Sequence, residues 1–203
     1  MFRCIVLDAM GVIFEAADDV AELLVPFVRT ANPATTSHDV ESAYLSASLG
    51  DLDADSFWRR LGLDPEVEDL YLKGHSMVPG AISFLQAARH VGVPVWCLSN
   101  DVERWSLKLR ENFKIESYLE GAVISSAARA RKPSPEIYRL LLARSGYAAE
   151  EIIFVDDRQK NVAVARELGI SALQFSRDLG YESLKRQLLD SVPDISLARG
   201  RER

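Results

Sequence analysis

Five short runs rich in apolar and β-branched residues, separated by segments with helical periodicity, restrict the fold of this chain more than any other feature. The runs cover residues 2–7, 93–98, 121–125, 151–155 and 170–175. Several are apolar throughout instead of alternating, which is typical of strands buried on both faces of a parallel sheet. Strands that alternate with helices indicate βαβ crossovers. We therefore predict an α/β fold built on a doubly wound parallel sheet.

Three segments between these runs carry signals for the start and the end of a helix. They are residues 79–90, 134–145 and 161–168. The first begins with a proline, which is favoured in the first turn of a helix. The second begins with a serine cap followed by a proline, and the second and third both end at a glycine. Each segment is therefore predicted to form a crossover helix.

Residues 15–77 interrupt this alternation, because they contain no convincing strand. Four stretches in the interval have acidic first turns and glycine or polar ends, as helices do: residues 16–31, 37–50, 53–62 and 65–74. A direct strand-to-helix connection needs only about 2–6 residues. We therefore predict an α/β core of residues 1–14 and 78–190, an inserted helical module over 15–77, and a polar tail, residues 191–203, that frays.

Composition excludes several classes of function. The 203 residues include 24 Lys and Arg against 30 Asp and Glu, a formal charge of −6, which disfavours binding to a nucleic-acid backbone. No apolar stretch reaches the roughly 18–20 residues that span a bilayer, and the first residues lack a signal-peptide pattern. Cys4 and Cys97 lie in apolar runs, so no disulfide framework is expected. We expect a cytoplasmic protein without a nucleic-acid or membrane partner.

Polar side chains follow the predicted strands where each strand ends. Asp8 follows the first strand, Ser99 the second and the pair Asp156 and Asp157 the fourth, while Lys132 lies in the loop after the third. In an open α/β sheet, ligands bind at the carboxyl ends of the strands. We therefore expect these side chains to meet at one rim.

The chemistry of this set points to a phosphoryl group and a hard cation. Three neighbouring carboxylates repel one another unless a cation joins them, and oxygen ligands suit Mg²⁺ together with a substrate phosphate. Lys132 and the Ser99 hydroxyl can neutralise or donate to phosphoryl oxygens. Asp8 would then be free to act as a nucleophile and form an aspartyl-phosphate that water hydrolyses.

The sequence resembles the haloacid dehalogenase-like (HAD) hydrolases in four motifs. These are LDAMGV at 7–12, LSN at 98–100, RKPSPEIY at 131–138 and FVDDRQKN at 154–161. The motifs occur in the family's order, and the resemblance covers essentially the whole chain. It implies a Rossmann-like core, with residues 15–77 in the place of the family's small α-helical cap.

The resemblance also implies ligands for Mg²⁺. Asp8 matches the nucleophile and a metal ligand, and the backbone carbonyl of Met10 matches a second ligand. Asp157 matches a further ligand, and Asp156 matches either a ligand or a residue that holds a metal-bound water.

On the substrate side, the resemblance implies three binding residues. Ser99 together with Asn100 matches the phosphate-binding position, and Lys132 matches the residue that holds nucleophile and phosphate together. The implied partner is a small phosphorylated substrate, and the protein is expected to be a monomer or a homodimer.

Met10 departs from the pattern of the family's phosphatases, which usually carry a second Asp two residues after the nucleophile. That Asp protonates the leaving oxygen and then activates water, and methionine does neither. His75 is one candidate for a substitute proton shuttle, although a hinge residue exposed to solvent fits it better.

Three interpretations of Met10 follow. The favoured one is a Mg²⁺-dependent phosphatase whose substrate has a good leaving group, such as a diphosphate, an acyl phosphate or an anomeric sugar phosphate. The second is a 2-haloacid dehalogenase that attacks carbon, where a non-acidic residue at this position is normal. The third is a HAD-fold binding or regulatory protein without turnover. The cap helices contain nothing that identifies the substrate.

Overall fold

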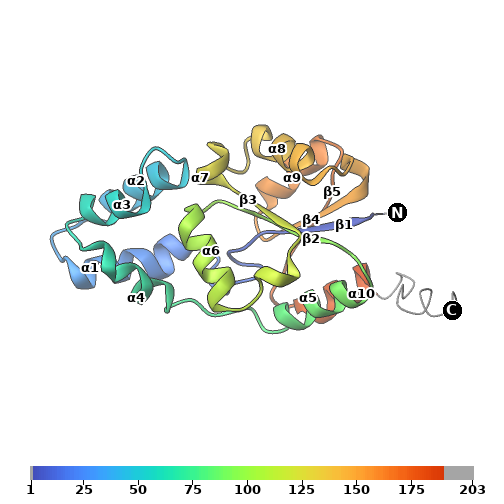
Figure 1. The fold of residues 1–203 in the computed structure, drawn as a ribbon, viewed down its shortest axis with the longest axis horizontal. Coiled ribbons are helices and arrows are strands. Elements are labelled where there is room, and N and C mark those ends of the chain that lie inside the picture. The colour runs from blue at the N-terminus through green and yellow to red at the C-terminus, as the bar shows by residue number, and fades with distance from the viewer. Residues whose placement is uncertain (1, 190–203) are drawn as a thin grey trace, which may run out of the picture.

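A five-stranded parallel sheet lies at the centre of the molecule (Figure 1). The computed structural model describes residues 2–189. The strands are β1 (Cys4–Leu7), β2 (Val95–Ser99), β3 (Gly121–Ile124), β4 (Ile152–Asp156) and β5 (Ser171–Gln174). Their order in the sheet is β3-β2-β1-β4-β5, and all neighbours run parallel. The predicted doubly wound sheet is confirmed, with small differences at the strand ends.

The sheet register brings the ends of the central strands to one level. Leu7 of β1 lies beside Cys97 of β2 on one side and Val155 of β4 on the other. The residues after these positions are therefore presented at one edge of the sheet. β1 and β4 are buried throughout, which explains why their sequences are continuously apolar.

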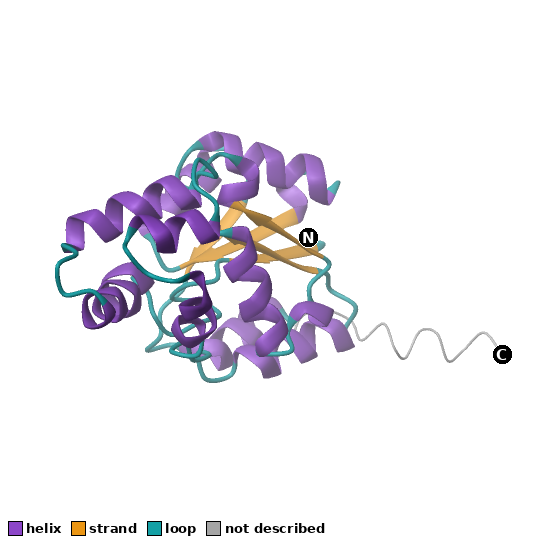
Figure 2. Ribbon diagram, turned by 60° about the vertical axis from the view of Figure 1, so that its left-hand side comes forward, coloured by secondary structure: helices purple, strands orange, loops and turns teal. Residues whose placement is uncertain are grey.

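Helices cover both faces of the sheet (Figures 1 and 2). One layer contains α8 (Pro135–Ser145) and α9 (Gln159–Glu167), and the opposite layer contains α5 (Ala81–His90) and α10 (Gly180–Leu188). Four other elements among the described residues belong to the core: α6 (Glu103–Asn112), η3 (Glu116–Tyr118), α7 (Ser125–Ala128) and η4 (Ala149–Glu151). The three predicted crossover helices are confirmed as α5, α8 and α9.

The start of α8 differs in one detail from the prediction. Pro135 occupies the first turn and Gly146 ends the helix with a φ of +74°, as predicted. The Ser134 hydroxyl, however, donates to the carboxylate of Glu136 and caps no backbone N–H group. Proline and glycine therefore define this helix more than its serine does.

Residues between β1 and α5 form the inserted helical segment, which lies on the left in Figure 1. Its elements are η1 (Val20–Leu24), α1 (Val25–Ala31), α2 (Ser37–Ser48), α3 (Ala54–Arg60), η2 (Pro65–Val67) and α4 (Glu68–Leu72). Thr36 and Asp39 form a capping box at the start of α2, and Asp53 caps α3. All four stretches predicted to be helical are helical. The division of the chain into domains stays a prediction.

Pro26 breaks the first inserted helix into two pieces. Proline has no N–H group, and its ring clashes with the carbonyl four residues earlier in a regular α-helix. The turn before it, η1, widens so that the N–H of Val25 bonds to the carbonyl of Val20. An α-helix then continues from Val25 to Ala31.

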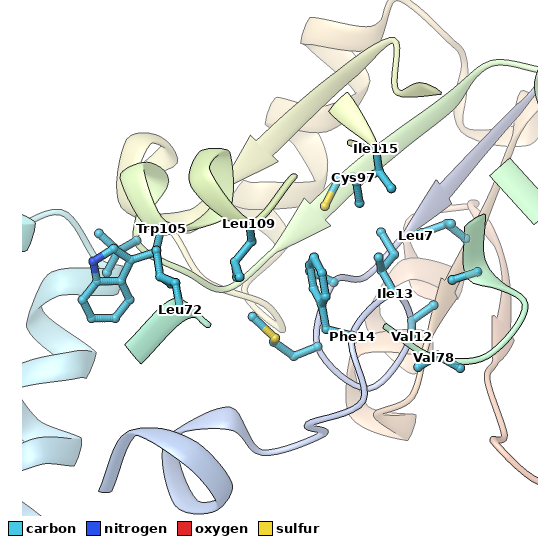
Figure 3. Packing of buried hydrophobic residues seen from close by; sticks show 14 of the residues in the cluster. Leu7, Val12, Ile13, Phe14, Leu72, Val78, Cys97, Trp105, Leu109 and Ile115 are labelled. Atoms are coloured by element: carbon cyan, nitrogen blue, oxygen red, sulfur yellow. The ribbon is translucent and has the colours of Figure 1, made fainter. Parts of the chain in front are cut away.

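One hydrophobic cluster runs without interruption from the sheet into the inserted helical segment (Figure 3). Leu7 and Cys97 lie on the face of the sheet, Phe14 lies on the connecting chain, and Leu72 and Trp105 lie at the inserted helices and α6. A second cluster fills the other face under α8 and α9. The inserted helices therefore share an apolar core with one face of the sheet.

The chain enters and leaves the inserted helical segment through two adjacent stretches. Phe14 pairs antiparallel with Met77, and the Glu15 N–H donates to the Ser76 carbonyl at 2.9 Å. The predicted tail over 191–203 lies outside the described residues, as does residue 190. Among residues 2–189, no helix has the length and apolar character needed to cross a membrane.

Candidate active site

Asp8 stands at the edge of the sheet directly after the central strand β1. Its N–H donates to the Val155 carbonyl at 2.9 Å, so the ladder between β1 and β4 extends to this residue. Its side-chain Oδ1 accepts a hydrogen bond from the Ala9 N–H at 2.7 Å. The residue is only 6% exposed. The backbone therefore holds one carboxylate oxygen in place and leaves the other for chemistry.

Gly11 allows the turn after β1 to approach Asp157. Its φ is +78°, and a Cβ atom at this position would lie 2.5 Å from Asp157 Oδ2. Any other residue would push the turn and the carboxylate apart. As a result, Asp8, Asp156 and Asp157 each offer an oxygen within 4.8 Å of the others.

Lys132 joins two of these carboxylates. Its Nζ lies 2.7 Å from Asp8 Oδ1 and 2.8 Å from Asp156 Oδ2, and it also donates to the Leu98 carbonyl at 2.7 Å. Burial alone would lower the pKa of Lys132, but the attraction of Asp156 and Asp8 outweighs it and raises the pKa. The lysine is therefore held as a buried ammonium ion.

Asp156 uses both of its oxygens within the protein. Asn161 Nδ2 donates to both at 3.0 Å, and Oδ1 also accepts from the Arg158 N–H at 2.8 Å. Burial opposes ionisation, but Lys132 outweighs it and lowers the pKa of Asp156. These contacts give Asp156 the role of holding Lys132, which is neither of the two roles that the sequence left open, a metal ligand or a residue that holds a metal-bound water.

Asp157 has the opposite environment. Its Oδ1 is buried and has no hydrogen-bond partner. Burial and the neighbouring Asp156 raise its pKa, and burial also raises the pKa of Asp8 well above its usual range despite Lys132. Three carboxylates and one lysine leave an excess of negative charge, which a divalent cation with oxygen ligands would balance. The residues present therefore fit Mg²⁺.

Ser99 and Asn100 have different surroundings although they are adjacent. The Ser99 hydroxyl is buried and has no hydrogen-bond partner. Asn100 Nδ2 donates to the Lys132 carbonyl at 2.9 Å, and its Oδ1 accepts from the Lys132 N–H at 2.7 Å. The serine hydroxyl is therefore available to a ligand, while the asparagine side chain holds the loop that carries Lys132.

A small cavity of about 60 Å³ opens at this edge of the sheet. The predicted residues that line it are Asp8, Met10, Ser99, Asn100 and Lys132. The Met10 side chain is 7% exposed and belongs to the hydrophobic cluster shared with the inserted helices. It supplies an apolar part of the cavity wall.

The cavity is also lined by residues outside the predicted site set: Ala17, Asp18, Asp19, Val20, Tyr44, Arg131, Arg158 and Asn161. Asp19 and Tyr44 belong to the inserted helical segment, and the Tyr44 hydroxyl donates to the Asn100 carbonyl at 2.9 Å. Arg131, Arg158 and Asn161 lie within two of the motifs quoted above, which is a signal that the sequence did contain. The sequence around Asp19 indicates only the start of a helix, and that around Tyr44 only the interior of one, so neither pattern points to the site.

His75 does not line the cavity. It is buried between the rings of Phe14 and Tyr71, and its Nδ1 lies 3.2 Å from the Leu72 carbonyl. Burial lowers its pKa, so it is held as a neutral ring. Neither the proton shuttle nor the exposed hinge residue considered from the sequence describes it.

The fold and this site define a class of α/β protein: a parallel sheet with an acidic site and a buried lysine at one edge, approached by helices inserted after the first strand. The model of the haloacid dehalogenase-like hydrolase family matches residues 2–169. The chain belongs to this family.

Several characterised proteins are similar over part of the chain. Flavin mononucleotide hydrolase 1 of Arabidopsis thaliana is 29% identical over 126 residues, covering 62% of this chain and 50% of that protein. Phosphoserine phosphatase of Thermus thermophilus is 29% identical over 129 residues, covering 63% and 50%. The chain spans about half the length of such relatives.

Solved structures share the fold. A HAD-family enzyme of Bacteroides thetaiotaomicron, in complex with magnesium and inorganic phosphate, aligns with a TM-score of 0.75 at 20% identity over 91% of this chain and 99% of that one. L-2-haloacid dehalogenase of Xanthobacter autotrophicus aligns with a TM-score of 0.62 at 21% identity over 98% and 88%. At these identities the likeness concerns the fold.

Proposed function

We propose that the protein is a Mg²⁺-dependent phosphatase that acts through an aspartyl-phosphate on Asp8. The observation that carries the proposal is the unequal pairing of the three carboxylates. Lys132 pairs with Asp8 and Asp156, while Asp157 keeps an unpartnered buried oxygen beside them. A dehalogenase that attacks carbon would have no use for this additional charge. The names of the phosphatase relatives and the magnesium and phosphate bound in the Bacteroides enzyme support the same choice.

In the first half of the reaction, the free oxygen of Asp8 attacks phosphorus while the bond to the leaving oxygen breaks and its electron pair departs with the leaving group. The Lys132 ammonium and the Ser99 hydroxyl hold phosphoryl oxygens. Asp156, Asn161 and Asn100 hold Lys132 in position through the hydrogen bonds described above. Mg²⁺ bound by Asp8, Asp157 and the carbonyl of residue 10 would supply charge neutralisation at the transferring group.

Residues 15–77 serve, in this proposal, as a cap over the reacting atoms. Tyr44 joins α2 to the end of β2 through the Asn100 carbonyl, and Asp19 and Tyr44 form part of the cavity wall. Exclusion of water strengthens the electrostatic contacts within.

Met10 restricts the leaving group. It has no proton to give, and its side chain is packed into the apolar cluster. We therefore propose substrates whose leaving oxygen departs with little protonation: diphosphates, acyl phosphates or anomeric sugar phosphates.

A screen of small phosphorylated metabolites, with and without Mg²⁺, tests the function. We expect phosphate release that EDTA stops and that Asp8→Asn lowers by a factor on the order of 10³ or more. Full activity of Asp8→Asn would contradict the nucleophile. Halide release from a 2-haloacid without metal would instead support the dehalogenase, which Met10 also fits. Ligand binding without either reaction would support a binding protein.

A Met10→Asp variant in the same screen tests the restriction on the leaving group. It should gain activity on simple alkyl phosphates, which need a proton to depart. An unchanged substrate range would contradict the role given to Met10.

A further inference from the structure

The inserted helical segment places one buried carboxylate in the wall of the cavity. Asp19 is 6% exposed, and its Oδ2 has no hydrogen-bond partner although it is buried. Its neighbour Asp18 also lines the cavity, but Asp18 is exposed, and its Oδ1 accepts from the Ala21 N–H at 3.2 Å. The two acids at the start of η1 are therefore not equivalent. Asp18 accepts a hydrogen bond at the start of the helix, whereas Asp19 has a buried carboxylate oxygen without a partner in the protein.

Burial of a carboxylate oxygen without a partner costs free energy, so such a group calls for an explanation, and a function in the site is one. Asp19 shares the cavity with Asp8, Ser99 and Lys132, the residues to which we assign phosphoryl transfer. It reaches the cavity from the inserted segment, whereas those residues belong to the edge of the sheet. A phosphoryl group attached to Asp8 would lie in the cavity whose wall Asp19 helps to form.

Several titratable and charged groups surround Asp19. They are Asp18 on the same segment, Tyr44 on α2, Tyr71 on α4, Asp101 after β2, Arg131 before α8 and Arg158 after β4. Arg158 uses a guanidinium N–H to donate to the Ala17 carbonyl at 2.9 Å. Burial raises the pKa of Asp19 to about 7, with Asp18 adding to the shift and Arg158 opposing it.

We propose that Asp19 is the general base that activates water in the second half of the reaction. This inference rests on the proposed phosphatase function. The water oxygen attacks the phosphorus of the aspartyl-phosphate, the bond between phosphorus and the Asp8 oxygen breaks, and its electron pair returns to the Asp8 carboxylate. The proton lost by the water passes to the Asp19 carboxylate and then to solvent. Phosphate leaves the cavity.

Asp19 thus supplies the proton acceptor that methionine at position 10 cannot provide, but only in the second half of the reaction. A good leaving group needs no proton in the first half, whereas the attacking water must lose one whatever the substrate. A carboxylate with a pKa near 7 is also a stronger base than an ordinary aspartate, and a fraction of it is ionised at neutral pH. His75, the other candidate, does not line the cavity.

The test is a rapid-quench experiment on the full chain with Mg²⁺ and p-nitrophenyl phosphate, whose leaving group is a weak base. In Asp19→Asn, nitrophenol should appear as a burst of about one equivalent, followed by steady-state turnover reduced by roughly 10²–10⁴-fold. Phosphoenzyme should accumulate, as seen with a ³²P-labelled substrate such as acetyl phosphate. The rise in dephosphorylation rate with pH through about 7 should disappear.

Glu22→Gln is the matched control, because it removes an exposed carboxylate from the same element and does not line the cavity. It should keep both the burst and the turnover. If Asp8→Asn abolishes turnover while Asp19→Asn changes neither phase, the inference fails and the phosphatase stands. If Asp8→Asn retains turnover, the phosphatase mechanism itself fails.

Loss of the burst together with turnover in a folded Asp19→Asn variant would also overturn the inference, because the first half does not require this base. Added formate should restore turnover in Asp19→Ala, an effect that a purely structural role would not produce. Should neither variant fold, the pH dependence of dephosphorylation in the unaltered chain decides. A rate independent of pH between roughly 5.5 and 8.5 would overturn the proposal.

Discussion

Two clusters of charged residues in this protein differ in how their buried carboxylates are paired. The site cluster, formed by Asp8, Lys132, Asp156 and Asp157, has three acids to one base. The junction cluster is formed by Glu68 on α4, which is its buried acid, and by Arg104, Trp105 and Lys108 on α6. It joins the inserted helical segment to α6. One cluster leaves polar atoms unsatisfied at the edge of the sheet, and the other surrounds a single carboxylate with donors.

The junction cluster gives each oxygen of the Glu68 carboxylate a partner: hydrogen bonds converge on Oε2, and Oε1 forms an ion pair. Glu68 Oε2 accepts from the indole N–H of Trp105 at 2.7 Å, from that of Trp58 at 3.3 Å and from Arg104 Nη2 at 2.5 Å. Lys108 Nζ lies 2.9 Å from the other oxygen. The aromatic rings around it are packed edge to face or tilted. Such an arrangement stabilises the packing of the inserted helices and leaves nothing for a ligand.

The difference between the clusters indicates which buried charges stabilise the fold and which serve a ligand. Buried charge that serves the fold is paired within the protein, because an unpaired buried charge costs free energy. Buried charge in excess of its partners is retained where a ligand supplies the balance. Substitutions in the two clusters should therefore affect different measurements.

The largest effect is expected from Lys132→Met. Removal of the ammonium leaves Asp8 and Asp156 without their shared partner, which should lower turnover by about 10²–10³-fold. It should also lower the free energy of unfolding by roughly 3–5 kcal/mol without Mg²⁺. Enzyme assays and urea unfolding measure the two effects. Lys73→Met, at an exposed lysine of the inserted segment, is the control, and equal losses in both variants would refute the site's dependence on Lys132.

Glu68→Gln should break the junction cluster and spare the chemistry. Loss of the charged hydrogen bonds should lower the free energy of unfolding by about 2 kcal/mol, while turnover per folded molecule is retained. Asp55→Asn removes a partly exposed partner of the same Arg104 and should cost less than about 1 kcal/mol. Urea titration and kcat measure the contrast. A Glu68 variant that remains fully stable but loses turnover would reverse the assignment of the two clusters.

The smallest effect concerns acid stability. Burial would raise the pKa of Glu68, but hydrogen bonds from Arg104, Lys108 and Trp105 outweigh it, and the net pKa lies below the ordinary value of 4.5. A depressed carboxyl pKa contributes stability above the unfolded-state value, and this contribution disappears as the pH falls through the folded-state pKa. The stabilities of the unaltered chain and of Glu68→Gln should therefore converge below about pH 4.5 in urea titrations. A constant difference down to pH 3 would count against this linkage.

Local patterns in the sequence were sufficient to predict the sheet, the crossover helices and the helical character of the insertion. Strands buried on both faces need continuous apolar runs, and prolines and glycines mark helix ends. The meeting of Asp8, Ser99 and Asp156 at one edge follows from parallel strands in register. The one apolar core shared by the sheet and the inserted helices did not follow, because no local pattern indicates which helix face meets the sheet.

The sequence by itself determined which residues stand at the strand ends, with Met10 two residues after Asp8. Both Asp18 and Asp19 line the cavity, and tertiary structure alone decided which of them is buried without a partner and which is exposed and bonds to the helix start, because that depends on the direction in which η1 enters from the sheet. It also decided that Asp156 serves Lys132 while Asp157 keeps a free oxygen. The sequence gives the type of each residue, but the hydrogen-bond and ion-pair partners of a side chain depend on its neighbours in three dimensions. The free energy of a buried charge depends on those neighbours.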